Sequence, residues 1–172
     1  TKTIISPPSS YGGRRIFLLW HRSQSSTGNP PPPWMGSDVG DARAMHLALY
    51  RCKKPIITAL EKFAINAGAF LAFACDLIVA SETAFLQIGE TQQGASIPKN
   101  AAWLKIKTTE SQAARLAFLG DRVVAPELLR LELISECASD DCVVERCNEI
   151  AATIAGYPAG SAIAVKQPLV AQ

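Results

Sequence analysis

The sequence predicts a mixed α/β fold, because short apolar strands and helices alternate in the middle of the chain. A β-rich run at residues 56–60 is followed by a turn of small residues at 66–68. A helix-competent apolar run, 69–75, comes next and leads to a second short apolar strand at 77–80. A strand that enters a helix through small residues leaves the first helical N–H groups unpaired and open to a ligand oxygen. The rest of the chain is expected to surround this unit.

Length and composition indicate a globular chain. With 172 residues, 48% of them hydrophobic and 19% charged, it can bury a core and have a polar surface. A net charge of +2 gives no strong attraction to polyanions, so we predict no nucleic-acid or membrane partner. The longest nearly apolar stretch, 63–75, is interrupted by Asn66 and is too short to span a bilayer.

The five cysteines are interpreted as reduced thiols. An odd number of cysteines without a recognisable signal peptide is typical of an intracellular chain, and we predict a cytoplasmic location. Cys137, Cys142 and Cys147 recur at regular spacing, but no CxxC or paired histidine accompanies them. We therefore expect no metal site.

The remaining elements follow from local patterns. Residues 1–35 are rich in Pro, Ser and Gly and are expected to be an irregular N-terminal segment with one strand at 16–20. A helix is predicted at 41–52 with Asp41 as its N-cap. After a loop at residues 92–100, further helices are predicted at 101–107, 111–119, 126–131, 141–155 and 160–170, the last one broken at Pro168.

Several ordered landmarks make the sequence similar to a known family. They are Met35-Gly36-Ser37-Asp38-Val39, Lys54-Pro55-Ile56-Ile57, Asn66-Ala67-Gly68, Ala74-Cys75-Asp76-Leu77-Ile78, Glu90 with Gly94, Ile97-Pro98, and Leu119-Gly120-Asp121-Arg122. Over residues 35–166 the chain resembles the crotonase (enoyl-CoA hydratase/isomerase) superfamily. The resemblance implies a crotonase-type spiral of short strands and helices in ββα turns, with residues 36–172 as an acyl-CoA-binding domain. Terminal segments usual in that family are not recognisable, so we expect a spiral incomplete at both ends.

The resemblance implies a reaction on an acyl-CoA thioester through an enolate-like intermediate. Two backbone N–H groups would stabilise the thioester oxygen, and here they belong to Ser37 and Ala67. Losing one such donor costs on the order of 3 kcal/mol of transition-state stabilisation. A plain helix start with Asn66 as N-cap is the alternative interpretation of the turn, and it is compatible with this role.

The carboxylates favour one reaction of the family over another. Hydratases of the family use two glutamates, and the matching positions are Phe70 and Glu90. Adding water needs a base and an acid, whereas moving a double bond needs one group that takes a proton and returns it two carbons away. We therefore favour an enoyl-CoA isomerase in fatty acid metabolism with Glu90 as the proton shuttle. Phe70 would keep water out of the acyl pocket.

Other interpretations stay open. The protein could be an enoyl-CoA hydratase or related acyl-CoA lyase, or a non-catalytic crotonase-like subunit used in assembly. Glu90 could be a solvated loop acid, and Lys166 could lie near the nucleotide end of CoA or be a solvated helix lysine. By family resemblance we expect a homo-oligomer, a trimer or hexamer, with CoA as part of the substrate and no metal or redox cofactor. The site would be lined by Met35, Gly36, Asp38, Val39, Asn66, Gly68, Phe70, Gly89 and Gln93.

Overall fold

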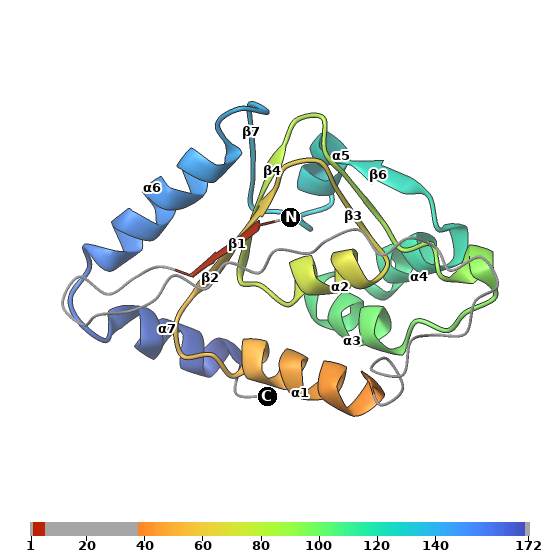
Figure 1. The fold of residues 1–172 in the computed structure, drawn as a ribbon, viewed down its shortest axis with the longest axis horizontal. Coiled ribbons are helices and arrows are strands. Elements are labelled where there is room, and N and C mark those ends of the chain that lie inside the picture. Colours follow the sequence, from red (N-terminus) through yellow and green to blue (C-terminus); the bar gives the residue numbers. More distant parts are fainter. Residues whose placement is uncertain (1, 6–37, 171–172) are drawn as a thin grey trace.

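A computed structural model describes residues 2–5 and 38–170 of the chain. The backbone forms two small sheets surrounded by helices (Figure 1). In the first sheet the strand order is β1-β2-β4-β7, formed by Lys2–Ile5, Ile56–Leu60, Leu77–Ser81 and Glu136–Ala138. In the second sheet the order is β3-β5-β6, formed by Phe63–Ile65, Phe85–Gln87 and Arg122–Val124.

The two sheets are built by a repeated strand–strand–helix turn. β2 and β3 are followed by α2 (Ala67–Phe73), and β4 and β5 are followed by a 3₁₀ turn, η2 (Thr91–Gln93), and α3 (Pro98–Lys107). In each turn the first strand joins one sheet and the second strand joins the other, and the equivalent strands pair in parallel. This arrangement confirms the α/β spiral of ββα turns.

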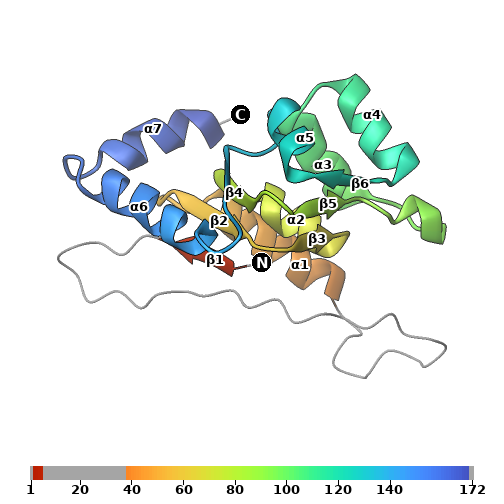
Figure 2. The same cartoon turned by 90° about the horizontal axis from the view of Figure 1, so that it is seen from above.

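The remaining helices cover the sheets from several sides. α1 (Asp38–Tyr50) precedes β2, α4 (Glu110–Leu119) follows α3, and α5 (Ala125–Arg130) follows β6. α6 (Val143–Ala155) and α7 (Ser161–Val170) form the end of the molecule opposite α4 (Figures 1 and 2). No helix of the described residues is long and apolar enough to cross a membrane.

Apolar burial is divided between two clusters. The larger cluster lies among the second sheet, the neighbouring ends of β2 and β4, and helices α2 to α5. In the smaller cluster one face of β2 and β4 packs on α6 through Ile57, Ala59, Val79, Val143, Cys147 and Ala151. Every residue of β2 is buried. β2 is therefore part of the core along its whole length.

An ion pair between a buried lysine and a partly exposed aspartate attaches α7 to the core. The Lys166 Nζ lies 2.7 Å from Asp76 Oδ2 and donates to the Lys54 carbonyl at 3.0 Å. Asp76 Oδ2 also accepts the Ile56 N–H at 2.7 Å, at the start of β2. Since Lys166 is only 5% exposed, the interpretation of a solvated lysine is wrong.

Several sequence predictions hold and others need correction. The strand at 56–60 is confirmed, and the strand at 77–80 extends by one residue to Ser81. Asp41 as N-cap is wrong, because α1 begins at Asp38. Part of the expected loop at 92–100 is helical, because α3 begins at Pro98. The strand predicted at 16–20 lies outside the described residues.

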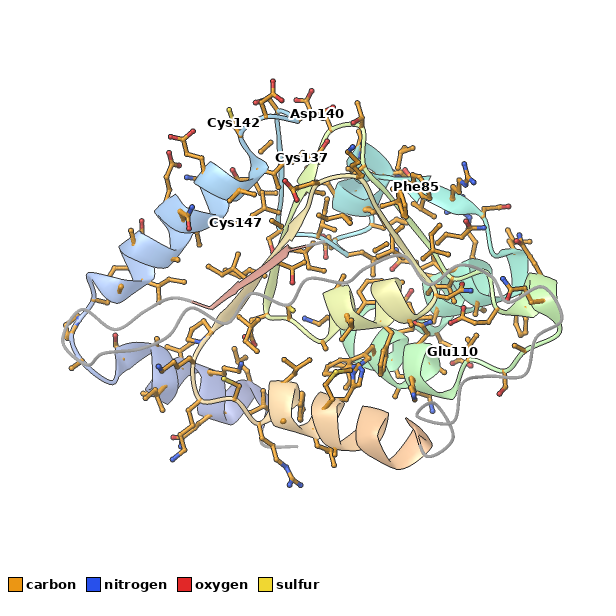
Figure 3. The ribbon with its side chains drawn as sticks, in the orientation of Figure 1. Phe85, Glu110, Cys137, Asp140, Cys142 and Cys147 are labelled. Carbon is orange, nitrogen blue, oxygen red and sulfur yellow. The ribbon has the colours of Figure 1, made fainter. Side chains whose placement is uncertain are left out.

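The cysteines show no sign of a metal centre in the described part of the chain. No group of three or more His, Cys, Asp or Glu residues there is placed to hold a metal ion. Cys137, Cys142 and Cys147 follow one another from β7 into α6 (Figure 3). Burial raises the pKa of the Cys147 thiol to about 12, with the charge of Glu136 adding to the effect. This cysteine is therefore a protonated core side chain.

Candidate active site

The turn before α2 has an unusual backbone conformation at Asn66. Its φ is 50° and its ψ is −109°, a region that side chains rarely adopt and that asparagine tolerates better than alanine. The Asn66 side chain does not cap the helix. Its Oδ1 instead accepts the N–H of Gly89 at 2.8 Å, and the Asn66 N–H donates to the Gln87 carbonyl at 2.9 Å. Asn66 is therefore the N-cap of α2 by position, as the alternative interpretation has it, but its side chain makes no capping hydrogen bond and instead connects the turn to Gly89.

Ala67 is the first residue of α2. The first helical hydrogen bond runs from the Phe70 N–H to the Asn66 carbonyl at 3.1 Å. The N–H of Ala67 donates to no backbone acceptor within the described ranges. Ala67 is exposed, whereas Gly68 and Phe70 behind it are buried. The role of this N–H as a donor to the thioester oxygen stays a prediction.

The carboxylate of Glu90 lies close to this turn. Glu90 is half-buried, and its Oε1 accepts a hydrogen bond from Asn100 Nδ2 at 2.7 Å. Its Oε2 is buried and has no hydrogen-bond partner among the residues that the structure describes. The alternative of a solvated loop acid is wrong. A carboxylate with one oxygen held and the other unpaired is suited to accept a proton.

Asn100 is a site residue that the sequence analysis missed. It lies in the first turn of α3, is 2% exposed, and also donates from Nδ2 to the Asn66 carbonyl at 3.3 Å. Pro98 signals a helix start and so would have placed residue 100 inside a helix, but it does not indicate the contacts of Asn100 with Glu90 and Asn66.

Phe70 forms an aromatic wall beside the turn. Its ring packs on His46 of α1 with the ring centroids 3.0 Å apart, and the Lys99 Nζ lies 5.6 Å from its centroid. His46 Nδ1 accepts the Trp103 Nε1–H at 3.1 Å, so the neutral ring carries its proton on Nε2. Burial, with the nearby charge of Lys99 adding to it, lowers the pKa of His46 to about 4. The wall is therefore uncharged at neutral pH.

The other predicted lining residues lie in different settings. Gly89 is buried beside Asn66, while Gln93 is exposed in η2. Asp38 and Val39 form the first turn of α1. Met35, Gly36 and Ser37 lie outside the described residues. The structure thus brings Asn66, Ala67, Phe70 and Glu90 together, and the Ser37 half of the site stays a prediction.

Comparison with known proteins decides the family. The sequence model of the family described as enoyl-CoA hydratase/isomerase matches residues 39–172. The chain belongs to the enoyl-CoA hydratase/isomerase family. This confirms the resemblance to the crotonase superfamily.

The relatives of this family member include hydratases. A probable enoyl-CoA hydratase of Rhodobacter capsulatus is 28% identical over 148 residues, which cover 77% of this chain and 58% of the relative. The 2,3-dehydroadipyl-CoA hydratase of Escherichia coli K12 is 27% identical over 137 residues, covering 78% of this chain and 54% of the relative. The chain therefore spans little more than half the length of these relatives.

Solved structures of the family include an isomerase. A monofunctional enoyl CoA isomerase from M. smegmatis matches with a TM-score of 0.69 at 28% identity, covering 75% of this chain and 61% of that one. ThnE from S. clavuligerus matches with a TM-score of 0.73 at 26% identity, covering 77% and 70% of the two chains. These neighbours confirm the fold of this hydratase/isomerase family member, and the names among its relatives include both reactions.

Proposed function

We propose that this member of the enoyl-CoA hydratase/isomerase family is an isomerase that moves a double bond in an acyl-CoA thioester from the 3 to the 2 position. The observation that carries the proposal is the carboxylate of Glu90 beside the turn at Ala67, with Phe70 at the position that matches the second glutamate of the family's hydratases. The unpaired Oε2 of Glu90 supports its role as proton shuttle.

The reaction balances with one carboxylate. Glu90 Oε2 takes a proton from C2 of the 3-enoyl-CoA, and the electrons of that C–H bond form an enolate at the thioester oxygen. The N–H groups of Ala67 and Ser37 would stabilise the enolate, each contributing on the order of 3 kcal/mol. The protonated Glu90 then returns the proton to C4, which leaves the double bond between C2 and C3 and restores the carbonyl.

The surroundings of Phe70 support isomerisation over hydration. Hydration needs a second polar group that activates the water or protonates the α-carbon. At the matching position the chain has Phe70, whose ring packs against neutral His46. An apolar wall excludes water from the enolate, which would otherwise be protonated from solvent. The hydratase alternative draws its support from the relatives named as hydratases.

One assay separates these alternatives. The full chain is given a 3-enoyl-CoA and, separately, a 2-enoyl-CoA, and the conjugated double bond is followed by its absorbance. An isomerase gains conjugation from the first substrate and leaves the second unchanged. Loss of conjugation from the second substrate indicates a hydratase, and binding of either thioester without turnover indicates a non-catalytic subunit.

Substrate and assembly belong to the same proposal. CoA enters as part of the substrate, without a separate cofactor. The predicted trimer or hexamer is tested by light scattering of the purified chain with and without an acyl-CoA.

A further inference from the structure

Asn100 connects the two halves of the candidate site through one nitrogen atom. Its Nδ2 lies 2.7 Å from Glu90 Oε1 and 3.3 Å from the Asn66 carbonyl oxygen. An amide NH₂ group carries two hydrogens, so it can donate to both oxygens at the same time. Asn100 is 2% exposed and its Oδ1 is buried without a partner among the described residues, so solvent does not compete for these contacts.

The carbonyl of Asn66 determines which way the amide of Asn100 points. A backbone carbonyl can only accept a hydrogen bond, so Asn100 has to present its NH₂ group to Asn66. The same NH₂ group then meets Glu90 Oε1. One oxygen of the carboxylate is held in this way, and the other oxygen is left for the proton.

The same carbonyl belongs to the peptide group that carries the Ala67 N–H. The described residues contain no cis peptide bond, so this planar group directs its N–H away from its carbonyl oxygen. Holding the oxygen of Asn66 therefore also fixes the direction of the Ala67 N–H. The Phe70 N–H also donates to this carbonyl at 3.1 Å, so Asn100 is a second donor to it and is the side chain that connects the donor peptide group to the base.

We propose that Asn100 is a positioning residue that holds the Glu90 carboxylate and the Asn66–Ala67 peptide group in a fixed mutual geometry. This inference rests on the proposed function, in which Glu90 moves the proton and the Ala67 N–H meets the thioester oxygen. Both groups act on neighbouring atoms of one thioester, so a displacement of about 1 Å can cost on the order of a hundredfold in rate.

Two substitutions of similar size separate positioning from simple filling of space. Asn100→Leu removes both hydrogen bonds, and Asn100→Asp keeps the shape but directs an oxygen at two acceptors. Positioning predicts that kcat falls on the order of a hundredfold in both variants. KM changes much less, and the Asp variant is the slower of the two. Asn148 on the exposed face of α6 supplies the matched control, and Asn148→Leu and Asn148→Asp should leave kcat unchanged.

A spectroscopic measurement separates the two held groups. The carbonyl stretch of a bound acyl-CoA analogue shifts to lower frequency when N–H donors polarise the thioester. Asn100→Leu should lose part of this shift, whereas Glu90→Gln should lose turnover and keep the shift. A variant at residue 100 that keeps the full shift and full kcat overturns the inference.

Crystal structures of the full chain make the test independent of activity. The inference requires that the Glu90 carboxylate and the Asn66–Ala67 peptide group move in Asn100→Leu relative to the unsubstituted protein. Unmoved groups overturn the inference, whether or not the protein is an isomerase. Moved groups in a protein that does not isomerise leave the positioning role standing and reject the proposed function. If leucine prevents folding, Asn100→Ser carries the same test, because its hydroxyl is too short to reach both acceptors.

Discussion

The side-chain oxygen of Asn66 accepts a hydrogen bond from the backbone N–H of Gly89 across 2.8 Å. This bond joins the turn before α2 to the residue that immediately precedes Glu90. Asn66 also adopts a φ of 50°, so one residue supplies both the backbone conformation and the connection. Glycine at this position would adopt the backbone conformation but could not make the hydrogen bond to Gly89. Alanine would favour neither the conformation nor the hydrogen bond.

Substitution of Asn66 should rank by these two properties. We expect Asn66→Ala to be less stable than Asn66→Gly by about 1 to 2 kcal/mol, because alanine adds backbone strain to the lost hydrogen bond. Denaturant unfolding of the two variants measures the difference. Equal stabilities would mean that the backbone relaxes out of the positive-φ region at no cost.

Glu90→Gln should abolish isomerisation without releasing the substrate. The amide keeps the size of the side chain but cannot take a proton, so kcat should fall about a hundred- to ten-thousand-fold. Affinity for the acyl-CoA, measured by calorimetry, should change little. Exposed Glu110 at the start of α4 is the control position, and Glu110→Gln should keep full activity. Turnover that survives in Glu90→Gln would reject Glu90 as the shuttle.

His46 should make the fold sensitive to mild acid. Its pKa is about 4 in the fold and about 6.5 when exposed, so between these values the unfolded chain binds a proton that the folded chain does not. Stability is therefore fully present above about pH 6.5 and falls as the pH drops toward 4, by about 2 kcal/mol at pH 5.

The measurement is the free energy of unfolding at pH 7.5 and pH 5 for the original chain and for His46→Phe. The acid-induced loss should be smaller in the variant by about 2 kcal/mol. His21→Phe removes the other histidine of the chain and should retain the loss. An identical loss in all three proteins would contradict a neutral His46.

Glu132 occupies a position that favours glycine, and Glu132→Gly should stabilise the protein. Its φ is 59°, and it follows α5 in a Schellman motif, in which the Leu133 N–H donates to the Leu128 carbonyl and the Glu132 N–H to the Leu129 carbonyl. The relief of strain exceeds the entropy cost of glycine by about 0.5 to 1 kcal/mol. The midpoint temperature of thermal unfolding should rise in Glu132→Gly, and it should not rise in Glu132→Ala.

Lys166→Met should detach α7 from the core. The substitution removes the two hydrogen bonds that the Lys166 Nζ donates to Asp76 Oδ2 and to the Lys54 carbonyl, and losing such a charged hydrogen bond costs about 1.5 to 3 kcal/mol. Amide hydrogen exchange should show α7 losing protection before the sheets do. Lys105 is exposed in the last turn of α3, and Lys105→Met is the control that should leave stability unchanged.

The sequence was sufficient for the elements whose pattern is local. β2 was predictable because it is a run of β-branched and apolar residues that follows a proline, and every one of its residues is buried. β3 and β5 were not predicted, since each strand has only three residues. In addition, Phe63, the first residue of β3, is exposed at the surface. Such strands are defined by pairing with each other and not by their own composition.

The candidate site divides in the same way. Glu90 and Ala67 were proposed as site residues because they lie in motifs that resemble those of the family, and their roles stay predictions. Asn100 could not be proposed in this way, because its role depends on contacts with residues 10 and 34 positions away in the chain. An asparagine has no local pattern that distinguishes a buried bridge from a surface turn.

β1 gives the first few residues of the chain a protective function. Residues 2–5 pair antiparallel with residues 56–59 and occupy the outer side of the first sheet. Removing them would leave β2, a buried and mostly apolar strand, with unpaired main-chain groups at an open sheet margin, which is a template for self-association. A shortened version that starts after residue 5 should therefore precipitate before it loses its fold.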